Sequence, residues 1–223
     1  MAIKLFFFDM EGTLVHGANV NRINGYGNSL WARLTEALGP QAIIDDDEGI
    51  RKWDAGEFQN YMEWCDFCLR NLQKHGLTRQ QFMHLVKEST IAPGAVETLA
   101  AIHAKGIKTA IVSGGFMAQA GRAQRALRIN HAYAATKLFW TAEGTIEHWN
   151  LLPSDNEGKV DFVELMRREY GLTKEECAFV GDGKNDVHIA KHVGLSFAYN
   201  AHPDLQKVAT RTITQLTEIL QHI

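Results

Sequence analysis

The sequence predicts an α/β fold with a doubly wound, Rossmann-like parallel sheet and a helical insertion near the start of the chain. Short apolar runs typical of buried strands occur at residues 3–8, 107–112, 177–180 and 195–199. Helical patterns separate these runs, and strands that alternate with helices form parallel sheets with right-handed crossovers. We therefore expect one sheet with helices on both faces.

The first apolar run, residues 3–8, contains one polar residue, Lys4, and is expected to be the central strand. The second run contains the polar residues Lys108 and Thr109 but is otherwise apolar. Runs this short and this apolar are typical of strands that are covered by helices on both sides.

Two helices of the predicted core have recognisable ends. Residues 93–105 begin with Pro93, which suits a first helical position, and Gly106 follows the last one. Residues 161–170 are amphipathic, and the pattern closes at Gly171. Both helices follow the usual order of start and stop signals.

Residues 17–88 interrupt the alternation of strands and helices. They show helical patterns at residues 28–38, 58–74 and 78–87 and no convincing strand. The acidic run at residues 45–48 is expected to be a solvated turn that starts a helix. Since this stretch is too long for a loop, we predict a helical cap domain of residues 17–88 on a core domain of residues 1–16 and 89–223. A cap placed there would act as a lid over the carboxyl edge of the sheet.

A smaller interruption occurs at residues 136–150. Two strand-like runs flank Glu143 and Gly144, which suit a tight turn, so we predict a β-hairpin.

Composition and charge exclude several classes of protein. The 223 residues carry a net charge of −3, so there is no basic surface for nucleic acid or for an anionic membrane. No apolar stretch approaches the ~18 residues of a membrane span, and Asp9 ends the first apolar run too early for a signal peptide. Three cysteines are too few for a disulfide framework, so we expect a cytoplasmic protein.

The first strand is followed by two carboxylates, Asp9 and Glu11. A carboxylate at a strand end can attack phosphorus and form an aspartyl-phosphate. A second carboxylate two residues on lies on the same side of an extended chain and can act as general acid and base. Gly12 allows the chain to turn, and Thr13 offers a hydroxyl or a backbone N–H to the site.

A polar segment, Ser113–Gly115, also ends the second strand and precedes a helical pattern, and polar side chains follow the third strand. Ser113 and Gly114 offer a hydroxyl and backbone N–H groups to a phosphate at a helix start. Asp182 and Asp186 offer oxygen ligands that suit Mg²⁺. Lys159 near a helix start opposes the helix dipole, and a partnership with Asp9 and a phosphoryl oxygen would explain it.

Each of these signals has a plainer alternative when taken alone. Asp9 can cap a turn, Glu11 can be an exposed acid, and Lys159 can be a surface lysine. Residues 181–186 lack the third glycine of a dinucleotide fingerprint and the Ser or Thr of a P-loop. It is their combination that favours phosphate chemistry.

In this order, Asp-x-x-Gly-Thr at residues 9–13, Ser-Gly-Gly at 113–115, Lys159 and Gly-Asp-Gly-x-Asn-Asp at 181–186 resemble the four motifs of the haloacid dehalogenase superfamily of phosphatases. The chain is most similar to the phosphoserine phosphatase branch. The resemblance covers roughly residues 1–16 and 90–200, whereas the cap resembles the family only in position and helicity.

The resemblance implies a role for each matching residue. Asp9 would be the nucleophile and a Mg²⁺ ligand, and Glu11 would be the general acid/base and lend its backbone carbonyl to Mg²⁺. Asp182 would ligate Mg²⁺ with support from Asp186. The implied phosphate and substrate site consists of Thr13, Ser113, Gly114, Lys159 and Asn185.

The chain departs from the branch at two places. Glu11, which is one methylene longer, stands where the second motif carboxylate is usually Asp. Residues 16–22 lack the acid that meets the substrate ammonium in the serine-phosphate enzymes. The cap arginine for the substrate carboxylate has no secure counterpart; Arg22, Arg51 and Arg70 are candidates. The resemblance therefore supports the type of reaction better than it supports phosphoserine as the substrate.

The insertion is rich in aromatic residues, which we expect mostly in the core of a helical bundle, with one or two facing the substrate cleft. Cys65 and Cys68 lie three residues apart on one helix face and are expected to pack there.

The predicted function is Mg²⁺-dependent hydrolysis of a small phosphorylated metabolite through an aspartyl-phosphate. The alternatives are phosphotransfer to a small alcohol such as homoserine, or a phosphate-binding module with negligible turnover. We expect a monomer or a homodimer.

Overall fold

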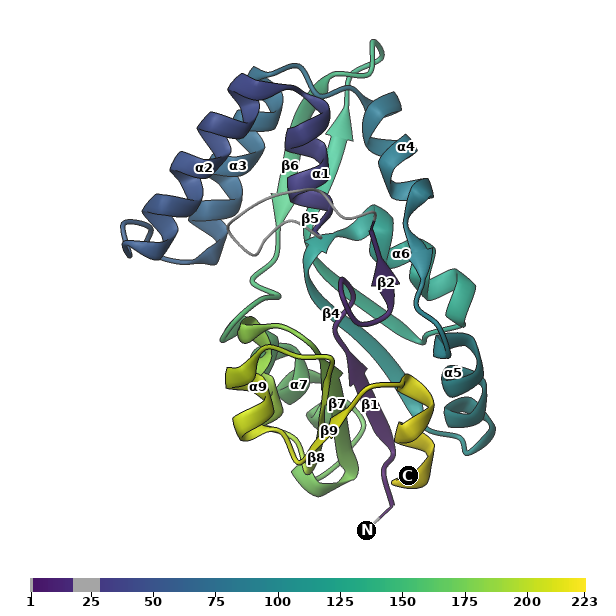
Figure 1. Cartoon of the computed structure of the whole chain (residues 1–223). Coiled ribbons are helices and arrows are strands. Elements are labelled where there is room, and N and C mark those ends of the chain that lie inside the picture. Colours follow the sequence, from purple (N-terminus) through teal and green to yellow (C-terminus); the bar gives the residue numbers. More distant parts are fainter. Residues whose placement is uncertain (1, 18–28) are drawn as a thin grey trace.

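A seven-stranded sheet in the order β6-β5-β4-β1-β7-β8-β9 forms the centre of the computed structural model, which describes residues 2–17 and 29–223 (Figure 1). Its strands are β1 (Leu5–Phe8), β4 (Lys108–Phe116), β5 (His131–Trp140), β6 (Ile146–Leu151), β7 (Cys177–Gly181), β8 (Leu195–Tyr199) and β9 (Arg211–Ile213). Neighbouring strands pair in parallel, and β5 and β6 pair antiparallel. The predicted α/β fold, its central first strand and its hairpin are confirmed.

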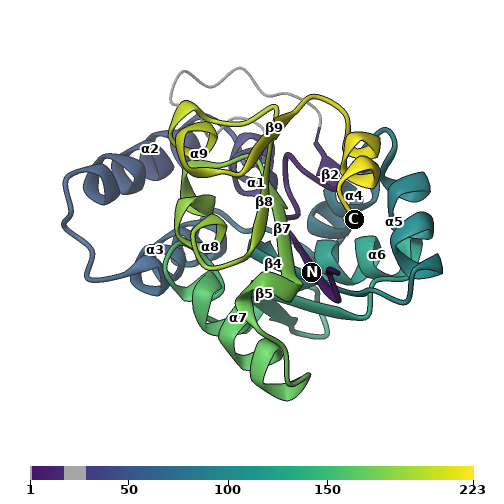
Figure 2. The same cartoon turned by 90° about the horizontal axis from the view of Figure 1, so that it is seen from below.

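The apolar run of β1 divides its side chains between the two faces of the sheet. Phe6 and Phe8 pack in the cluster that includes residues of α5 (Ala95–Ala104) and α6 (Met117–Leu127). Leu5 and Phe7 pack in the cluster that includes residues of α7, α8 and α9. These three helices span Gly158–Glu169, Val187–Ala190 and Pro203–Val208. Figure 2 shows the two sets of helices on opposite sides of the strands. A strand buried on both faces needs apolar side chains in both directions, which explains the continuous run.

Between β1 and β4, the part of the chain that the structure describes contains four helices. They form a helical layer, a name used below for α1 (Leu30–Ala37), α2 (Pro40–Asp54), α3 (Tyr61–Lys74) and α4 (Arg79–Glu88). Three of them match predicted helical patterns, and α2 was not predicted. The acidic run at residues 45–48 lies inside α2 and does not start a helix, and Asp46 is buried. The start signal is Pro40 after Gly39, which is typical of a first helical position.

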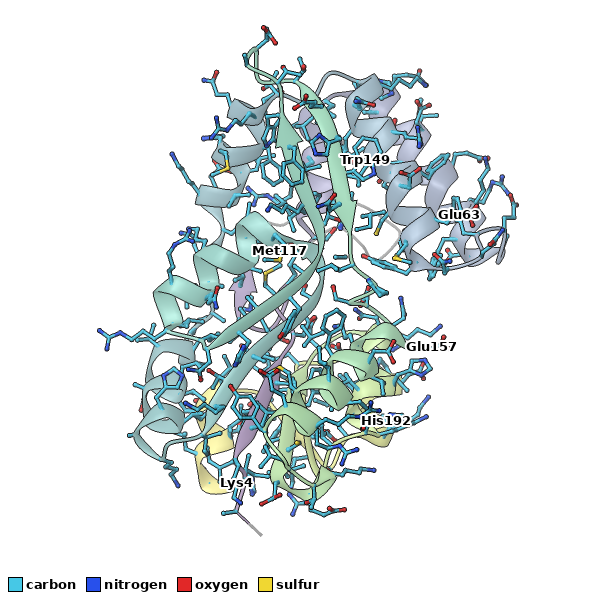
Figure 3. The ribbon with its side chains drawn as sticks, turned by 180° about the vertical axis from the view of Figure 1, so that it is seen from behind. Lys4, Glu63, Met117, Trp149, Glu157 and His192 are labelled. Carbon is cyan, nitrogen blue, oxygen red and sulfur yellow. The ribbon has the colours of Figure 1, made fainter. Side chains whose placement is uncertain are left out.

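The helical layer is fastened to the hairpin formed by β5 and β6. Trp149 Nε1 donates to Asp66 Oδ1 of α3 at 2.9 Å, and the N–H of Arg79 donates to the carbonyl of Gly144 at 2.8 Å. Figure 3 shows Trp149 on the hairpin beside the helices of the layer. The β5–β6 hairpin therefore extends beyond the rest of the sheet and packs against the helical layer.

Short elements connect these parts. β2 (Val15–His16) and β3 (Thr90–Ile91) pair antiparallel where the chain leaves the sheet for the layer and returns from it. The 3₁₀ turns are η1 (Lys174–Glu176), η2 (Lys184–Asp186) and η3 (Leu216–Gln221).

Two predicted helix starts are wrong. Helix α5 starts at Ala95 after Gly94, so Pro93 precedes the helix. Helix α7 starts at Gly158, three residues before the predicted start at residue 161. Strand β4 continues beyond the apolar run to Phe116, because its pairing with β5 extends to Phe116 and Thr136 after an irregularity. Among the described helices, none combines the length and the apolar character needed to cross a membrane.

Candidate active site

The predicted site residues meet at the carboxyl ends of three adjacent strands. Asp9 follows β1, Ser113 lies in β4 and Asp182 follows β7. In open α/β sheets this edge, near the point where the strand order reverses, is where ligands bind. A pocket of about 800 Å³ opens between these strand ends and helices α1 to α3.

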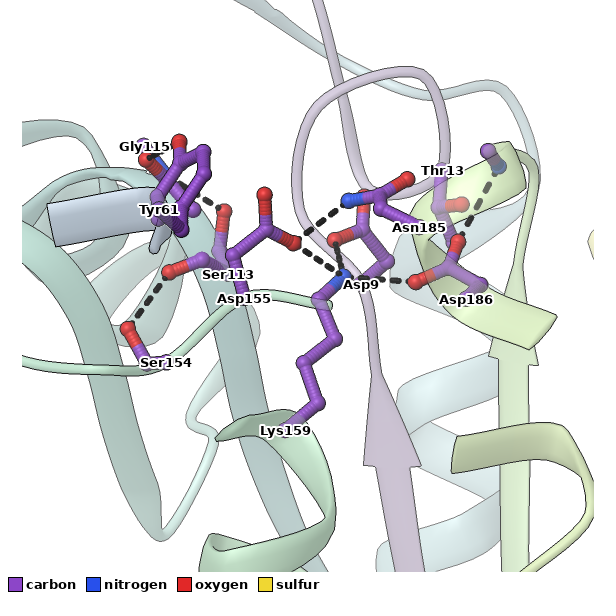
Figure 4. Close-up of polar contacts among 12 residues, drawn as sticks. Asp9, Thr13, Tyr61, Ser113, Gly115, Ser154, Asp155, Lys159, Asn185 and Asp186 are labelled. Carbon is purple, nitrogen blue, oxygen red and sulfur yellow. Dashed lines mark hydrogen bonds and ion pairs between the residues drawn. The ribbon is translucent and has the colours of Figure 1, made fainter. Parts of the chain in front are cut away.

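Lys159 is the cation at the centre of the site. Its side chain is completely buried, and its Nζ lies 2.6 Å from Asp9 Oδ1, 2.5 Å from Asp186 Oδ1 and 3.6 Å from Asp155 Oδ1 (Figure 4). Burial alone would lower the pKa of Lys159, but the three carboxylates raise it well above its ordinary range. Lys159 is therefore a permanent charge, and it sits in the first turn of α7 because these acids hold it there.

Asp9 is nearly buried, with 6% of its surface exposed. Burial raises the pKa of Asp9 well above its usual range, and Lys159 offsets part of that rise. The carboxylate is thus held in place by a charge-assisted hydrogen bond inside the pocket.

The loop after β7 presents a second pair of carboxylates. Asp186 Oδ2 accepts the N–H groups of Asp182 and Gly183 at 3.1 and 3.0 Å, which shapes the turn. Thr13 Oγ1 donates to Asp182 Oδ1 at 2.8 Å. Burial, followed by the Asp186 charge, raises the pKa of Asp182 to about 7. Gly12 is required opposite this loop, because its φ is +86° and a Cβ there would collide with Asp182.

Asp9, Asp182 and Asp186 form a candidate cation site. One carboxylate oxygen from each lies within 4.8 Å of the other two. Hard oxygen donors of this kind suit a hard divalent cation, and three crowded carboxylates beside one lysine leave negative charge to be balanced. The donor set therefore fits a metal ion.

Glu11 reaches from the strand end to the helical layer. Its Oε1 accepts the N–H of Leu30, the first residue of α1, at 2.7 Å. Burial raises the pKa of Glu11 to about 7, although the Leu30 N–H and Gln119 lower it in part. A carboxyl group that titrates near neutral pH can both give and take a proton.

As predicted, the Ser113–Gly115 segment lies near the end of a strand and precedes a helix, since it belongs to β4 and α6 starts at Met117. Ser113 Oγ accepts the N–H of Gly115 at 3.1 Å. The carbonyl of Gly114 accepts the hydroxyl of Tyr61 at 2.7 Å. A Cβ at Gly114 would collide with the Asp155 carboxylate and the Tyr61 hydroxyl, so a larger residue would require both side chains to shift.

Other predicted residues have specific partners. Asn185 Nδ2 donates to Asp155 Oδ1 at 2.6 Å. Arg51 pairs with Glu48, and Arg70 pairs with Asp66; neither lines the pocket. Arg22 lies outside the described residues.

Comparison with known proteins identifies the family to which this chain belongs. The family profile of haloacid dehalogenase-like hydrolases matches residues 3–194. The chain belongs to this family. It is 30% identical over 221 residues to a phosphoserine phosphatase of Idiomarina loihiensis, covering 97% of this chain and 91% of the relative. It is 31% identical over 231 residues to a phosphoserine phosphatase of Methanocaldococcus jannaschii, covering 99% and 97%.

A solved structure described as a phospho-aspartyl intermediate analogue of phosphoserine phosphatase has the same fold. It superimposes with a TM-score of 0.77 at 24% identity, and each chain is covered completely. The two curated relatives, at 30% and 31% identity, place this chain in the phosphoserine phosphatase-like branch of the haloacid dehalogenase-like hydrolases, as its motifs predicted.

Asp155 is a residue of this haloacid dehalogenase-like site that sequence reasoning missed. It is buried, lines the pocket and contacts both Lys159 and Asn185. Burial raises its pKa. Its position four residues before Lys159 is the signal that could have indicated it, since such spacing brings side chains together at a helix start.

Proposed function

We propose that this protein is a phosphatase that hydrolyses small phosphate monoesters through an aspartyl-phosphate formed on Asp9. The observation that carries the proposal is the pair Asp9 and Glu11, which faces the pocket from one strand end while Lys159 holds Asp9. Relatives named phosphoserine phosphatase support a phosphate ester as the substrate class.

In the first step, a carboxylate oxygen of Asp9 attacks phosphorus, and the bond from phosphorus to the ester oxygen breaks. Glu11 donates its proton to the departing oxygen. A group with a pKa of about 7 is protonated often enough to do this at neutral pH. Lys159 stabilises the negative charge of Asp9 and of the transferring phosphoryl group.

In the second step, water attacks phosphorus, and the bond between phosphorus and the Asp9 oxygen breaks. Glu11, which lost its proton in the first step, takes a proton from that water. Ser113, Gly114, Thr13 and Asn185 are proposed to complete the phosphate and substrate site.

Mg²⁺ is the cation proposed for the carboxylate cluster, held by Asp9, Asp182 and the backbone carbonyl of Glu11, with Asp186 in support. When bound, such an ion offsets the repulsion between a carboxylate nucleophile and a phosphate dianion. The ligand types suit Mg²⁺, which binds carboxylate and carbonyl oxygens and keeps several waters.

Residues 17–88 are proposed to be a cap domain on a core of residues 1–16 and 89–223. The layer forms one wall of the pocket, so its closure would exclude water from the reacting atoms. We also place the protein in the cytoplasm, because its three cysteines are buried thiols, as expected in a reducing compartment.

Replacement of the nucleophile tests the mechanism. Asp9→Asn removes the attacking oxygen charge, so phosphate release from a panel of phosphorylated metabolites with Mg²⁺ should fall at least about a thousandfold. The control is Asp161→Asn, which changes an exposed acid of α7 and should retain full activity. Undiminished release by Asp9→Asn would refute the mechanism. An assay with added homoserine distinguishes transfer to an alcohol from hydrolysis.

A further inference from the structure

The wall of the pocket that faces the strand ends is built from one face each of α2 and α3. On α2 this face carries Asp46, Ile50, Trp53 and Asp54, and on α3 it carries Tyr61, Trp64, Cys65 and Cys68. Spacings of three, four and seven residues place side chains on the same side of a helix. Both helices therefore direct a continuous face toward the space above the catalytic carboxylates.

Three aromatic rings from this wall form one packed cluster. Trp53 stacks on Trp64 with ring centroids 4.7 Å apart and an interplanar angle of 13°. Tyr61 meets both rings edge-on, at 6.1 Å from Trp53 and 5.8 Å from Trp64. Its hydroxyl is anchored on the carbonyl of Gly114, which ties the cluster to the phosphate side of the pocket (Figure 4).

All three residues are partly exposed, and all three line the pocket. A fourth ring, Trp31 of α1, lines the same pocket and packs on Phe116 with ring centroids 4.3 Å apart. We call these four residues the aromatic wall. The expectation of one or two aromatic residues at the cleft was therefore too low.

Among the described residues, the charged side chains that α1 to α3 contribute to the pocket are the acids Asp46 and Asp54. Asp54 follows Trp53 on α2, is exposed, and has no side-chain partner among the described residues. The basic side chains among the described lining residues are Lys184, His188 and His202, which belong to the sheet side. Among the described parts of α1 to α4, no arginine lines the pocket.

We propose that the leaving group of the substrate carries an alkylammonium cation and no carboxylate, as in the phosphate esters of choline and ethanolamine. Aromatic faces attract cations through the ring quadrupole, and they are the surfaces that recognise quaternary ammonium groups. The carboxylate of Asp54 adds attraction for the same charge. The assignment of the cation as part of a substrate rests on the proposed phosphatase function.

The same wall disfavours phosphoserine. The carboxylate of phosphoserine would face Asp54 and the negative faces of the aromatic rings. The described residues of the wall include no arginine that could neutralise the charge of that carboxylate. A choline or ethanolamine ester presents the ammonium group without that repulsion.

Binding measurements on two ligands of the same shape, one with the cation and one without it, test the contribution of the positive charge. We would measure dissociation constants for phosphocholine and for 3,3-dimethylbutyl phosphate, its neutral carbon isostere, by calorimetry on the Asp9→Asn protein with Mg²⁺. We expect phosphocholine to bind at least about tenfold more tightly than the isostere and more tightly than phosphoserine. A ratio near one between phosphocholine and the isostere would overturn the proposal.

Variants of the wall test whether its residues cause the preference for phosphocholine over the neutral isostere. Trp53→Leu and Asp54→Asn should each reduce the preference for the cation at least about threefold. Glu36→Gln, which changes an exposed acid of α1 that does not line the pocket, should leave this preference unchanged. Because Asp54 is exposed, its variant reports on the wall even if Trp53→Leu does not fold. An unchanged preference in Asp54→Asn and in a folded Trp53→Leu protein would refute the role of the wall.

Turnover by the unmodified protein distinguishes this inference from the proposed function. Hydrolysis of phosphate esters without preference for phosphocholine or phosphoethanolamine over the neutral isostere would refute the inference alone. Tight, charge-dependent binding without hydrolysis of any ester would refute the proposed function and leave the cation site standing.

Discussion

At the scale of single residues, the site depends on one buried cation among several buried carboxylates. Lys159 Nζ contacts Asp9 and Asp186 directly, and both acids are almost inaccessible to solvent. A buried ion pair adds little net stability compared with an apolar pair, but removal of one partner leaves an uncompensated buried charge. Lys159 thus has a structural effect that is separable from its effect on phosphate.

We expect Lys159→Met to lower the free energy of unfolding by about 3–5 kcal/mol in metal-free buffer, because Asp9 and Asp186 would lose their cation. Urea unfolding measures this change. Lys191→Met, which replaces an exposed lysine, should change stability by less than about 0.5 kcal/mol. Equal stabilities of the two variants would show that the carboxylates do not depend on Lys159.

At the scale of elements, one buried side chain at the end of β4 contributes to holding the helical layer, in addition to the contacts with the hairpin. Phe116 is fully buried and contacts Trp31 of α1 and Phe82 of α4, with ring centroids 4.3 and 5.3 Å apart. It belongs to the apolar cluster that joins the layer to β6. Because β4 also carries Ser113, one strand connects the phosphate side of the pocket with the layer.

Phe116→Ala should therefore loosen the layer. We expect a loss of about 3–5 kcal/mol in the free energy of unfolding, from the lost burial and the cavity that remains. Chemical denaturation measures the loss, and limited proteolysis should cut the layer first. Phe139→Ala is the matched control, because Phe139 is half-buried on the hairpin and stacks on His148. A loss no larger than that of Phe139→Ala would contradict the anchoring role.

At the scale of the whole molecule, buried carboxyl groups at the carboxyl ends of the strands make the metal-free protein less stable when they ionise. Burial raises the pKa values of both Glu11 and Asp182 to about 7. A carboxyl group whose pKa is higher in the folded than in the unfolded protein destabilises the fold as pH rises between those two values. For these two groups the window runs from about 4 to about 7.

Mg²⁺ should remove that penalty. In EDTA we expect the melting temperature to fall between pH 5 and pH 7.5 as these carboxyl groups lose their protons in the folded protein. Added Mg²⁺ should raise the melting temperature more at pH 7.5 than at pH 5, since protons compete with the metal for its ligands. Thermal scans at both pH values test this. Asp182→Asn should lose most of the Mg²⁺ effect, and an effect independent of pH and of Asp182 would place the ion elsewhere.

The local sequence determined the core of the fold. A strand whose successive side chains are all apolar, such as Phe6–Phe8 in β1, buries side chains on both faces of the sheet. Such a strand needs helices on both faces, so the run identifies a central strand from the sequence. The motif residues were also predictable, because carboxyl ends of parallel strands converge at one edge. Asp9, Ser113 and Asp182 accordingly line one pocket.

The helical layer was less predictable. Helix α2 has few apolar residues and an acidic centre, so its pattern is typical of a solvated segment. It is helical because a single face, with Ile50 and Trp53, packs toward α3 and the pocket. Strand β9 is only three residues long and has one buried side chain, which is too little for a periodic signal.

By itself, then, the sequence determined a doubly wound sheet, the carboxylates at its edge and the class of chemistry, because these follow from periodicity and from residues a few positions apart. The tertiary structure decided which distant groups meet: Asp155 with Asn185, Glu11 with the first N–H of α1, and the aromatic wall with the catalytic edge. The physical reason is that burial and packing depend on contacts between segments far apart in the chain, and such contacts leave no local pattern.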